Sequence, residues 1–439
     1  MNKQVVILGA GLAGLNCARN LDKRIGYKIF EKEDRVGGLC RSVEQDGFIF
    51  DFTGHLLHLR DQKMFALVRS LLPGNLNSLR RSSWIYSQGV HTRYPFQANT
   101  YGLPPKIVRE CLLGFIQAQI AGRRPKAGGS FYDWVMNNFG AGIGRYFMFP
   151  YNEKLWTLPA RELVTDWMGE YVPRPQVPEV ITGALTDQTR MFGYNANFWY
   201  PRRNGIQSLP DALARPLTSI QLGETAVKIN STEKTVQFAS GRTANYQKLV
   251  SSMSLVELLA MIENLPARVK RAAALLRYNC VLNINVGVTP DLGTDKHWIY
   301  FPEKKYPYYR IGVCSNFTNN NHPPDTSSLY IEISYRPGRK DRQNPTEIRR
   351  LVKHCTDSMY RTGLLKANTR VITTKVLNIS PAYCLYDLNR RNCLTVIREF
   401  LQGQGIYSIG RYGAWEYSAM EEALVAGEYT ALRIREELC

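Results

Sequence analysis

At 439 residues, the chain is long enough to bury a large core and to divide into two or three lobes. Its 44% hydrophobic and 21% charged residues are ordinary for a globular protein, and its most apolar later stretch, residues 111–121, is too short to span a bilayer. Lysine and arginine outnumber aspartate and glutamate by 56 to 37, which gives a net charge of +19 and favours an anionic ligand. No compact basic tract with interleaved aromatic residues occurs, which argues against a nucleic-acid partner.

Nine cysteines are scattered along the chain without a CxxC pair or a Cys/His spacing that would bind a metal. An odd, irregular set of this kind favours reduced thiols, as in cytosolic proteins. The first predicted strand begins within five residues of the first methionine, which leaves no room for a cleavable signal peptide. We therefore expect a cytoplasmic protein without a transmembrane segment or a metal site.

A buried strand is predicted over residues 5–8, followed at once by a glycine-rich turn and then by helical composition over residues 15–21. Gly9 permits the tight turn, Gly11 lets the backbone approach a pyrophosphate, and Gly14 allows the helix to pack closely on the strand. The pyrophosphate would sit on the helix N-terminus, where free N–H groups and the helix dipole favour negative charge.

A second strand over residues 27–30 ends in Glu31, twenty residues after Gly11. An acidic residue at this place in a dinucleotide-binding fold binds a ribose hydroxyl. Strand, glycines, helix, second strand and acid thus arrive in the order of a Rossmann-type unit, although glycine spacing alone does not distinguish FAD from NAD.

Residues 31–42 continue this motif with a Gly37–Gly38 pair, and this stretch resembles the extended FAD fingerprint of the amine-oxidase-like flavoproteins. The resemblance implies FAD as the cofactor. The cofactor-binding residues that we expect are Gly9, Gly11, Leu12, Ala13, Gly14, Glu31, Lys32, Gly37, Gly38, Leu39, Gly54, His55, Val227, Gly410 and Met420.

Residues 48–55 predict an aromatic strand that runs into a small-residue turn, which can bring the backbone close to a flat ligand ring. A histidine such as His55 is more often packed or hydrogen-bonded than catalytic, so the residue pattern leaves both alternatives open. Residues 84–90 predict a hairpin. Residues 104–190 have a helical pattern, with Ser130 placed to cap a helix that runs through Phe139.

Strands return at residues 226–229, 236–238 and 248–252, and we expect the last of these to rejoin the first sheet. Apolar residues then alternate with polar ones in two stretches, which predicts a second, largely antiparallel sheet with one covered face. The alternating apolar positions are Leu282, Ile284, Val286, Val288, Leu329, Ile331, Ile333 and Tyr335. A further strand and glycine turn over residues 406–411 and a helix over residues 420–438 complete the chain.

The predicted fold class is therefore α/β, with a Rossmann-type FAD-binding domain, a helical insertion and a second, mainly antiparallel sheet domain. We expect the FAD-binding domain to be assembled from three separated parts. Its predicted parts are residues 1–95, 196–262 and 391–439, with a helical substrate domain at 96–195 and a sheet substrate domain at 263–390.

Several segments taken together resemble the UDP-galactopyranose mutases, especially their longer, eukaryotic-type branch. The segments that carry this resemblance are Thr53-Gly54-His55, Tyr94-Pro95-Phe96-Gln97 with Asn99, Pro150-Tyr151-Asn152 with Lys154 and Trp156, Trp167 with Gly169-Glu170, Asn195 to Gly205, Trp298 to Glu303, Tyr309-Arg310, Ser315-Asn316, Ala382-Tyr383 and Gly410 to Tyr417. Each segment alone is as well explained by aromatic core filling, but their joint order along the chain makes chance agreement a poor explanation.

The resemblance implies catalytic roles for His55, Arg310 and Arg411. A diphosphate needs guanidinium partners, because arginine offers a planar fork of donors to phosphate oxygens. The implied substrate-binding residues are Phe96, Gln97, Tyr151, Asn152, Trp156, Tyr171, Asn195, Tyr300, Arg310, Tyr383, Arg411 and Tyr417.

The implied reaction is the pyranose–furanose ring contraction of a nucleotide sugar such as UDP-galactopyranose, with N5 of reduced FAD as the nucleophile and no net redox change. Reduction by NADPH is also what the resemblance implies. The alternative within the same superfamily is an oxidase or desaturase, as in the amine oxidases or protoporphyrinogen oxidases. A flavin-bearing binding protein without catalysis is a third hypothesis. The sequence leaves open whether the protein forms a homo-oligomer.

The chain departs from the resembled family at two positions. A second diphosphate arginine of the family is Tyr171 here, so one charged partner is lost unless Arg174, Arg202 or Arg203 replaces it. A tyrosine of the family after Ser315-Asn316 is Phe317 here, which removes a hydroxyl. These departures leave the cofactor motifs intact and leave the sugar, the base and the leaving group open.

Overall fold

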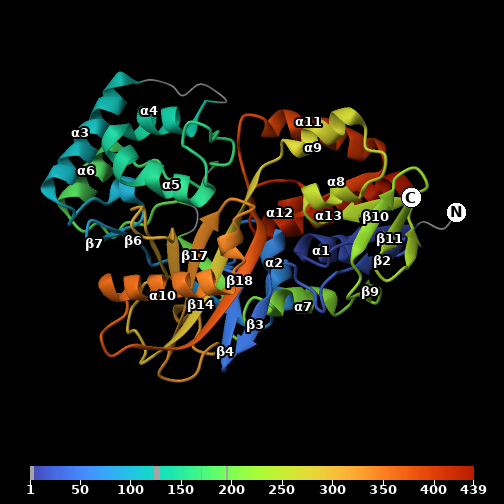
Figure 1. The fold of residues 1–439 in the computed structure, drawn as a ribbon, viewed down its shortest axis with the longest axis horizontal. Helices are drawn as coiled ribbons and strands as arrows, with labels where there is room; N and C mark the ends of the chain where they lie inside the picture. Colours follow the sequence, from blue (N-terminus) through green and yellow to red (C-terminus); the bar gives the residue numbers. More distant parts are fainter. Residues whose placement is uncertain (1–3, 123–128, 170, 194–195) are drawn as a thin grey trace.

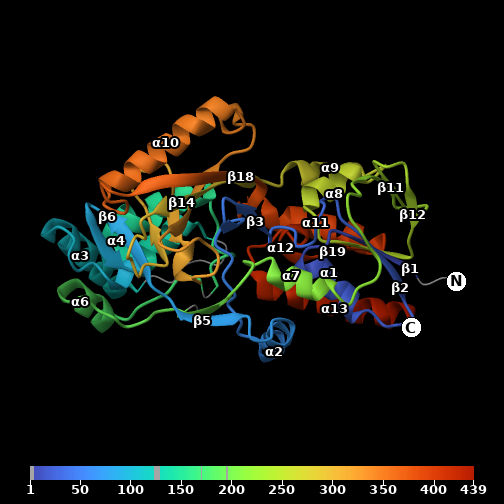
Figure 2. The same cartoon turned by 90° about the horizontal axis from the view of Figure 1, so that it is seen from below.

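The computed structural model describes residues 4–122, 129–169, 171–193 and 196–439. Two groups of elements lie side by side (Figure 1): a parallel sheet with its flanking helices on the right, and a larger sheet with a cluster of helices above it on the left. Turning the molecule shows the long strand β18 reaching from the left group toward the right one (Figure 2).

The parallel sheet has the strand order β19-β13-β1-β2-β9, and all of its neighbouring strands are parallel. Its strands come from widely separated parts of the chain, and β13 rejoins the sheet beside β1 as the sequence predicted. The predicted Rossmann-type parallel sheet is therefore confirmed. The strands are β1 (Gln4–Leu8), β2 (Gly26–Phe30), β9 (Ile220–Gln221), β13 (Lys248–Ser251) and β19 (Ile406–Ser408).

Helices cover both faces of this sheet and bury two apolar clusters against it. The first and last helices of the chain pack together, since Asn16 Nδ2 donates to the Leu424 carbonyl at 2.7 Å and Gly427 leaves room for the Ala13 carbonyl. The helices of the first cluster are α1 (Leu12–Asn20), α2 (Gln62–Leu71), α7 (Ser208–Ala214) and α13 (Met420–Leu438). Those of the second cluster are α8 (Leu255–Met261), α9 (Ala267–Ala274) and α11 (Arg390–Gly403), and the short helix α12 (Gly410–Gly413) packs Tyr412 against it.

The second sheet has seven strands in the order β18-β14-β17-β16-β15-β6-β7, and it is antiparallel except for the β15–β6 pair. Its mainly antiparallel character is as predicted. The strands are β6 (Ser83–Ser87), β7 (Val90–Arg93), β14 (Tyr278–Thr289), β15 (Trp298–Tyr300), β16 (Arg310–Val313), β17 (Ser327–Tyr335) and β18 (Arg370–Cys384). The β6–β7 hairpin thus lies in this sheet, although residues 1–95 were predicted for the FAD-binding domain, because β6 pairs with β15.

The prediction that this sheet has one covered face is wrong, because β14 is buried along almost its whole length. On one face, Ile284 joins an apolar cluster with Met359 of helix α10 (Pro345–Arg361). On the other face, Asn283 donates to the Asp51 carbonyl, and Gly287 lies so close to Phe48 that a Cβ would meet its ring. The hairpin of β3 (Ser42–Gln45) and β4 (Phe48–Asp51) therefore covers the face that the alternation left to solvent.

The helical pattern predicted over residues 104–190 is also confirmed, and these helices have an aromatic-rich core of their own. Ser130 caps α4 by accepting from the Asp133 backbone at 3.1 Å, and the helical backbone breaks at Gly140, next to the predicted end at Phe139. The elements of this region are α3 (Pro105–Ala121), α4 (Phe131–Ile143), α5 (Phe149–Trp156) and α6 (Val177–Leu185), with short turns η1 (Phe96–Ala98) and η2 (Gly144–Met148).

Smaller elements complete the fold. A three-stranded sheet contains the strands that the sequence predicted at residues 226–229 and 236–238. A separate two-stranded antiparallel sheet is formed by β5, which precedes the β6–β7 hairpin, and β8. These elements are β10 (Ala226–Asn230), β11 (Thr235–Phe238), β12 (Thr243–Asn245), β5 (Leu76–Arg80), β8 (Asn197–Pro201), η3 (Cys314–Asn316) and η4 (Lys340–Arg342).

Candidate functional site

A cavity of about 820 Å³ is lined by residues from both groups of elements. One part of its wall is the glycine-rich turn after β1 together with residues 37–41 and the turn at 52–56. The other part comes from helix α5, from strands β15 and β16, and from the segments around residues 378–383 and 410–420.

The first part of the wall is a cradle of close backbone contacts. Gly9 has a φ of 98°, and a Cβ on Gly14 would lie 2.1 Å from the Gly9 carbonyl oxygen. Gly11 pairs with Gly37 in an isolated bridge, and a Cβ on Gly11 would lie 3.9 Å from Gly38 Cα. Only glycine permits this approach of helix α1 to its strand, so the predicted role of Gly14 in packing fits the observed contact.

Helix α1 presents its N-terminus to this cradle, and within the described residues no side chain caps it. Its first N–H groups therefore stay available to phosphate oxygens. Glu31 directly follows β2, lines the same wall and is 5% exposed. Its carboxylate accepts the Ala10 N–H at 2.8 Å and the Glu33 N–H at 3.0 Å, which fixes it where a ribose hydroxyl would approach.

These residues fit FAD, because the cradle leaves backbone room for a diphosphate and ends in a fixed carboxylate. Val227 lies outside the cavity wall and is 49% exposed, whereas the preceding Ala226 lines the wall. The pairing of β10 with β11 has an irregularity between Ala226 and Lys228, so Val227 has no residue opposite it and its side chain is exposed. The predicted cofactor residues that line the cavity are Gly9, Gly11, Leu12, Ala13, Glu31, Lys32, Gly37, Gly38, Leu39, Gly54, His55, Gly410 and Met420.

Asp51 anchors the turn that follows β4. Its buried carboxylate accepts from the Ser42 hydroxyl at 2.6 Å, the Tyr200 hydroxyl at 2.7 Å and the Ile206 N–H at 3.2 Å. Burial raises the pKa of Asp51 to about 6, and these three donors oppose the shift. A Cβ on Gly205 would lie 2.8 Å from the carboxylate, which accounts for the glycine there.

His55 lies in the cavity wall at the end of this turn. Burial, followed by the positive charge of Arg411, lowers the pKa of His55 to about 4. The imidazole is therefore neutral at physiological pH, and its Nδ1 has no hydrogen-bond partner among the described residues. A neutral ring suits a role in shaping the surroundings of a cofactor better than a role as a positive charge.

Arg310 projects from β16 into the second part of the wall and forms a bidentate pair with Glu332 of β17. Nε donates to one carboxylate oxygen at 2.6 Å and an Nη atom donates to the other at 2.9 Å. Burial alone would lower the pKa of Arg310, but the Glu332 carboxylate raises it well above its ordinary value. Glu332 therefore fixes the direction of the guanidinium while the remaining N–H groups stay available to a ligand.

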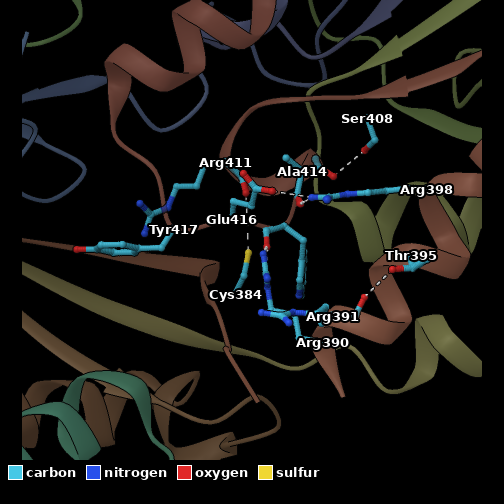
Figure 3. A network of polar contacts seen from close by, with 12 residues as sticks. Cys384, Arg390, Arg391, Thr395, Arg398, Ser408, Arg411, Ala414, Glu416 and Tyr417 are labelled. Carbon is cyan, nitrogen blue, oxygen red and sulfur yellow. Dashed lines mark hydrogen bonds and ion pairs between the residues drawn. The ribbon is translucent and has the colours of Figure 1, made fainter. Parts of the chain in front are cut away.

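Arg411 supplies a second guanidinium to the same cavity. It lies 5.1 Å from the centre of the Tyr383 ring and 5.0 Å from that of Tyr417, and it donates to the Ser418 carbonyl. Figure 3 shows Arg411 and Tyr417 side by side, while the Arg398–Glu416 ion pair lies on the opposite side of the segment. Arg310 and Arg411 thus face the same cavity, which favours an anionic ligand.

Tyrosine side chains surround the two arginines. The Tyr151 ring packs edge-on against Tyr300, with 5.2 Å between ring centres, and Tyr383 stacks near Tyr417 at 6.0 Å. Burial raises the pKa of Tyr151 and Tyr300 above the ordinary value, and it raises the pKa of Tyr171 to about 12. These three hydroxyls therefore stay neutral and can donate to an anion without adding charge.

Two expected substrate residues lie behind the wall. Phe96 is fully buried and stacks on Phe147, and Trp156 is fully buried against Trp167, where its edge supports the cavity tyrosines. Asn195 lies outside the described residues. The expected substrate residues that line the cavity are Gln97, Tyr151, Asn152, Tyr171, Tyr300, Arg310, Tyr383, Arg411 and Tyr417.

None of the three arginines considered as replacements at the Tyr171 position lines the large cavity within the described residues. Arg202 donates to the Leu76 carbonyl at the surface, and Arg203 is exposed beside it. Arg174 lines a separate pocket with Arg190. The arginines that line the large cavity are Arg41, Arg310 and Arg411.

Sequence reasoning missed Glu332, because its place between Ile331 and Ile333 indicated the solvent face of a strand. Glu332 can be recognised as the partner of Arg310 only when the strand register, which places the two residues opposite each other, is known. Asp51 was also missed, although an acid directly before the Thr53-Gly54-His55 turn was a usable signal. Within the described part of the chain, no histidine, cysteine and carboxylate cluster could hold a metal, and no helix is long and apolar enough to cross a membrane.

The chain matches a family profile, several solved structures and short stretches of other protein sequences. The sequence profile of the family described as flavin containing amine oxidoreductase matches residues 12–435. A crystal structure of reduced UDP-galactopyranose mutase is 26% identical in sequence, with a TM-score of 0.92 over 100% of this chain and 94% of the other. The similarity to these mutases that the sequence motifs predicted is therefore confirmed.

Other matches are to oxidases and desaturases. Putrescine oxidase bound to putrescine shares the fold, with a TM-score of 0.66 at 18% identity over 99% of both chains. Protoporphyrinogen oxidase 2 of Arabidopsis thaliana is 46% identical over 50 residues, 11% of this chain and 10% of the relative. A 1-hydroxycarotenoid 3,4-desaturase of Flavobacterium is 40% identical over 65 residues, 14% and 13% of the two chains. The chain thus matches about a tenth of the length of these two relatives.

Proposed function

The chain belongs to the family of flavin containing amine oxidoreductases, and we propose that within it the protein is a FAD-dependent pyranose–furanose mutase that acts on a nucleotide sugar such as UDP-galactopyranose. The observation that carries this proposal is the joining of two different walls in one cavity. A glycine cradle that fits FAD lines the same cavity as two half-buried arginines, which tyrosine side chains surround.

Reduced FAD would supply a nucleophilic ring nitrogen to the anomeric carbon of the sugar, with no net transfer of electrons. The residues of the chain have the complementary tasks. Arg310 and Arg411 stabilise the diphosphate as it leaves the sugar and hold it for its return, and Tyr300 and Tyr383 donate neutral hydrogen bonds to it. His55, a neutral ring in the cavity wall, would help to shape the surroundings of the bound cofactor.

The aromatic wall keeps water away from the reacting sugar. Trp156 is fully buried and packs with its edge toward Tyr383 and Tyr417, so the tyrosines that face the ligand have little freedom to move. Asn152, which donates to the Met148 carbonyl at 2.8 Å, keeps its amide oxygen for a ligand group. Such fixed donors and acceptors lower the cost of reorganisation during the reaction.

The alternative proposal is an oxidase or desaturase, which the family membership and the partial matches to protoporphyrinogen oxidase and carotenoid desaturase favour. Arg310 and Arg411 argue against a protonated amine, because like charges repel. They also argue against a purely apolar substrate, which would leave the guanidinium of Arg411 without a carboxylate or phosphate partner among the described residues, whereas Arg310 already has Glu332. We therefore place the mutase first.

The test is a turnover assay with the purified flavoprotein under exclusion of air. The protein is reduced with dithionite, so that the assay does not depend on NADPH. UDP-galactofuranose is then added, and its conversion is measured by chromatography. We expect interconversion with UDP-galactopyranose in the reduced state only. Conversion of neither isomer, together with reduction of the oxidised flavin by an amine or by a substrate whose carbon–carbon single bond becomes a double bond, and reoxidation of that flavin by oxygen, would assign the protein to the oxidases.

A further inference from the structure

Lys154 is enclosed by backbone carbonyl groups in the last turn of helix α5. Its ammonium donates to the carbonyl oxygens of Phe301 at 2.7 Å, Glu303 at 2.8 Å, Tyr306 at 3.0 Å and Tyr308 at 3.0 Å. An ammonium has three protons, so all of its donor capacity is directed at this one segment.

The segment held in this way, residues 301–308, is the connection between β15 and β16. It begins directly after Tyr300 and ends one residue before Tyr309, which precedes Arg310. Both ends of the connection therefore carry side chains that line the cavity, with Tyr300 at one end and Arg310 at the other. A shift of the connection would move both of them.

The helix that carries Lys154 also carries part of the opposite wall. Tyr151 lies one turn earlier on α5, and its ring is 5.2 Å from that of Tyr300 and 6.3 Å from that of Tyr309. Asn152 follows it and lines the same cavity. Lys154 is thus the polar link between the helix that presents Tyr151 and the strands that present Tyr300 and Arg310.

We propose that Lys154 is a positioning residue whose ammonium locks the 301–308 connection onto α5 and thereby sets the spacing between Tyr151 and the Tyr300–Arg310 pair. The proposal rests on the proposed function for its consequence, the binding of a nucleotide diphosphate between these groups. Its structural core, the locking of the connection by one ammonium, is independent of which anion is bound.

The physical basis is a set of charge-assisted hydrogen bonds in a place that water reaches poorly. Burial lowers the pKa of Lys154 to about 7, with the Glu303 carboxylate opposing the shift, while carbonyl oxygens around the ammonium favour its charged form. The Glu303 carboxylate itself bonds to the Gln88 N–H at 3.1 Å and pairs with Lys305. Four carbonyl dipoles are therefore the direct partners of the buried charge.

The first experiment compares the holoprotein with its Lys154→Met variant, which keeps the shape of the side chain and removes all of its N–H donors. We measure amide hydrogen exchange over residues 301–308 and the Kd for UDP. We expect faster exchange in this segment, a Kd raised roughly tenfold to a hundredfold, and unchanged FAD content. Lys353→Met, the same change on the surface of α10 where the ammonium pairs with Asp357, is the matched control and should leave all three readouts unchanged.

A rescue experiment separates positioning from a general loss of stability. In Lys154→Ala, propylammonium can return a primary ammonium and part of its stem to the carbonyl groups, whereas the same concentration of sodium cannot. We expect propylammonium to lower the Kd for UDP at least several-fold toward that of the wild type. If Lys154→Met does not yield folded holoprotein, Lys154→Gln, which keeps two N–H donors, replaces it in the first comparison.

The outcomes are distinguishable from those that test the proposed function. Folded Lys154→Met with unchanged exchange at residues 301–308 overturns the positioning role, whatever ligand the protein binds. Faster exchange with an unchanged Kd for UDP also overturns it, because the spacing of the cavity groups would not depend on Lys154. A wild-type protein that binds no UDP contradicts the proposed function instead, and the exchange result still decides whether the connection is locked by Lys154.

Discussion

The two walls of the cavity are built on different principles. The cradle around Gly9, Gly11 and Gly14 is made of backbone and depends on the absence of side chains, since a Cβ on Gly14 would lie 2.1 Å from the Gly9 carbonyl oxygen. The wall around Arg310 and Arg411 is made of long side chains and depends on what holds them. The first wall follows from a short stretch of sequence, whereas the second needs several distant segments to meet.

This difference predicts different failures. A change in the backbone wall should cost the protein its cofactor, and a change in the side-chain wall should cost it turnover while the cofactor stays bound. The variants below test that division, beginning with the change for which we expect the largest effect.

Replacing Gly14 by alanine should abolish most FAD binding. The added Cβ would lie 2.1 Å from the Gly9 carbonyl oxygen and 3.3 Å from an Ile7 side-chain carbon, so helix α1 must move away from β1. Overpacking of this kind costs about 1–3 kcal/mol and withdraws the helix N-terminus from the diphosphate. The measurement is the ratio of flavin to protein absorbance after purification.

Gly403 provides the matched control for this change, because a Cβ there would meet nothing within 4 Å. Gly403→Ala should purify with the full complement of flavin. Gly14→Ala with normal flavin content would contradict the backbone account of the cradle.

Replacing Arg310 by alanine should lower kcat by about 100- to 1,000-fold, because a preorganised charged donor to the leaving diphosphate is lost. Flavin content should remain near that of the wild type, since Arg310 belongs to the other wall. The measurement is turnover of the reduced protein beside its flavin absorbance.

The single variant leaves Glu332 buried without its partner, which is destabilising in its own right. The double variant Arg310→Ala, Glu332→Gln removes that charge and should show the same loss of turnover. Recovery of turnover in the double variant would mean that the unpaired carboxylate, not the missing guanidinium, had caused the defect.

Glu332→Gln alone should have a smaller effect on the same wall. The amide keeps one acceptor for Arg310 and loses the bidentate charged pair, so the guanidinium gains freedom to turn. We expect kcat to fall about tenfold with little change in flavin content. A variant as active as the wild type would remove Glu332 from the list of residues that direct Arg310.

The contrast between the walls also explains what could be predicted from sequence. The cradle was predictable because its rule is local: Gly9, Gly11 and Gly14 lie within six residues, and Glu31 follows at a fixed distance on the next strand. Arg310 and Arg411 were found through motif resemblance. Their partners were not, because the Arg310–Glu332 pair depends on strand register and the Lys154 contacts depend on how a helix meets a loop.

The misplaced expectations have equally physical causes. Val227 lies where the β10–β11 pairing is irregular between Ala226 and Lys228, so its side chain is exposed while Ala226 lines the cavity. Phe96 and Trp156 carry the aromatic signature of a binding site but serve as packing behind it. The covered second face of β14 could not be read from alternation, because polar residues such as Asn283 are buried there against the Asp51 carbonyl.

The smallest expected effect concerns Asp51, which directly precedes the 52–56 turn of the cavity wall and accepts hydrogen bonds from Tyr200 and Ile206. Burial raises its pKa to about 6, so between roughly pH 4 and pH 6 the folded protein holds a proton that the unfolded chain has released. Asp51 therefore makes the free energy of unfolding fall as pH rises through this window, by roughly 3 kcal/mol at most.

Asp51→Asn keeps the side-chain shape and removes this titration. Chemical unfolding of both proteins at several values between pH 4 and pH 7 gives the difference in unfolding free energy, in which the opposite contributions of buried histidines such as His55 cancel. We expect the variant to become more stable relative to the wild type as pH rises from 4 to 6, and the difference to level off above that. A difference that does not change with pH would mean that the Ser42, Tyr200 and Ile206 donors hold Asp51 ionised in the fold, which would make it a fixed negative charge beneath the His55 turn.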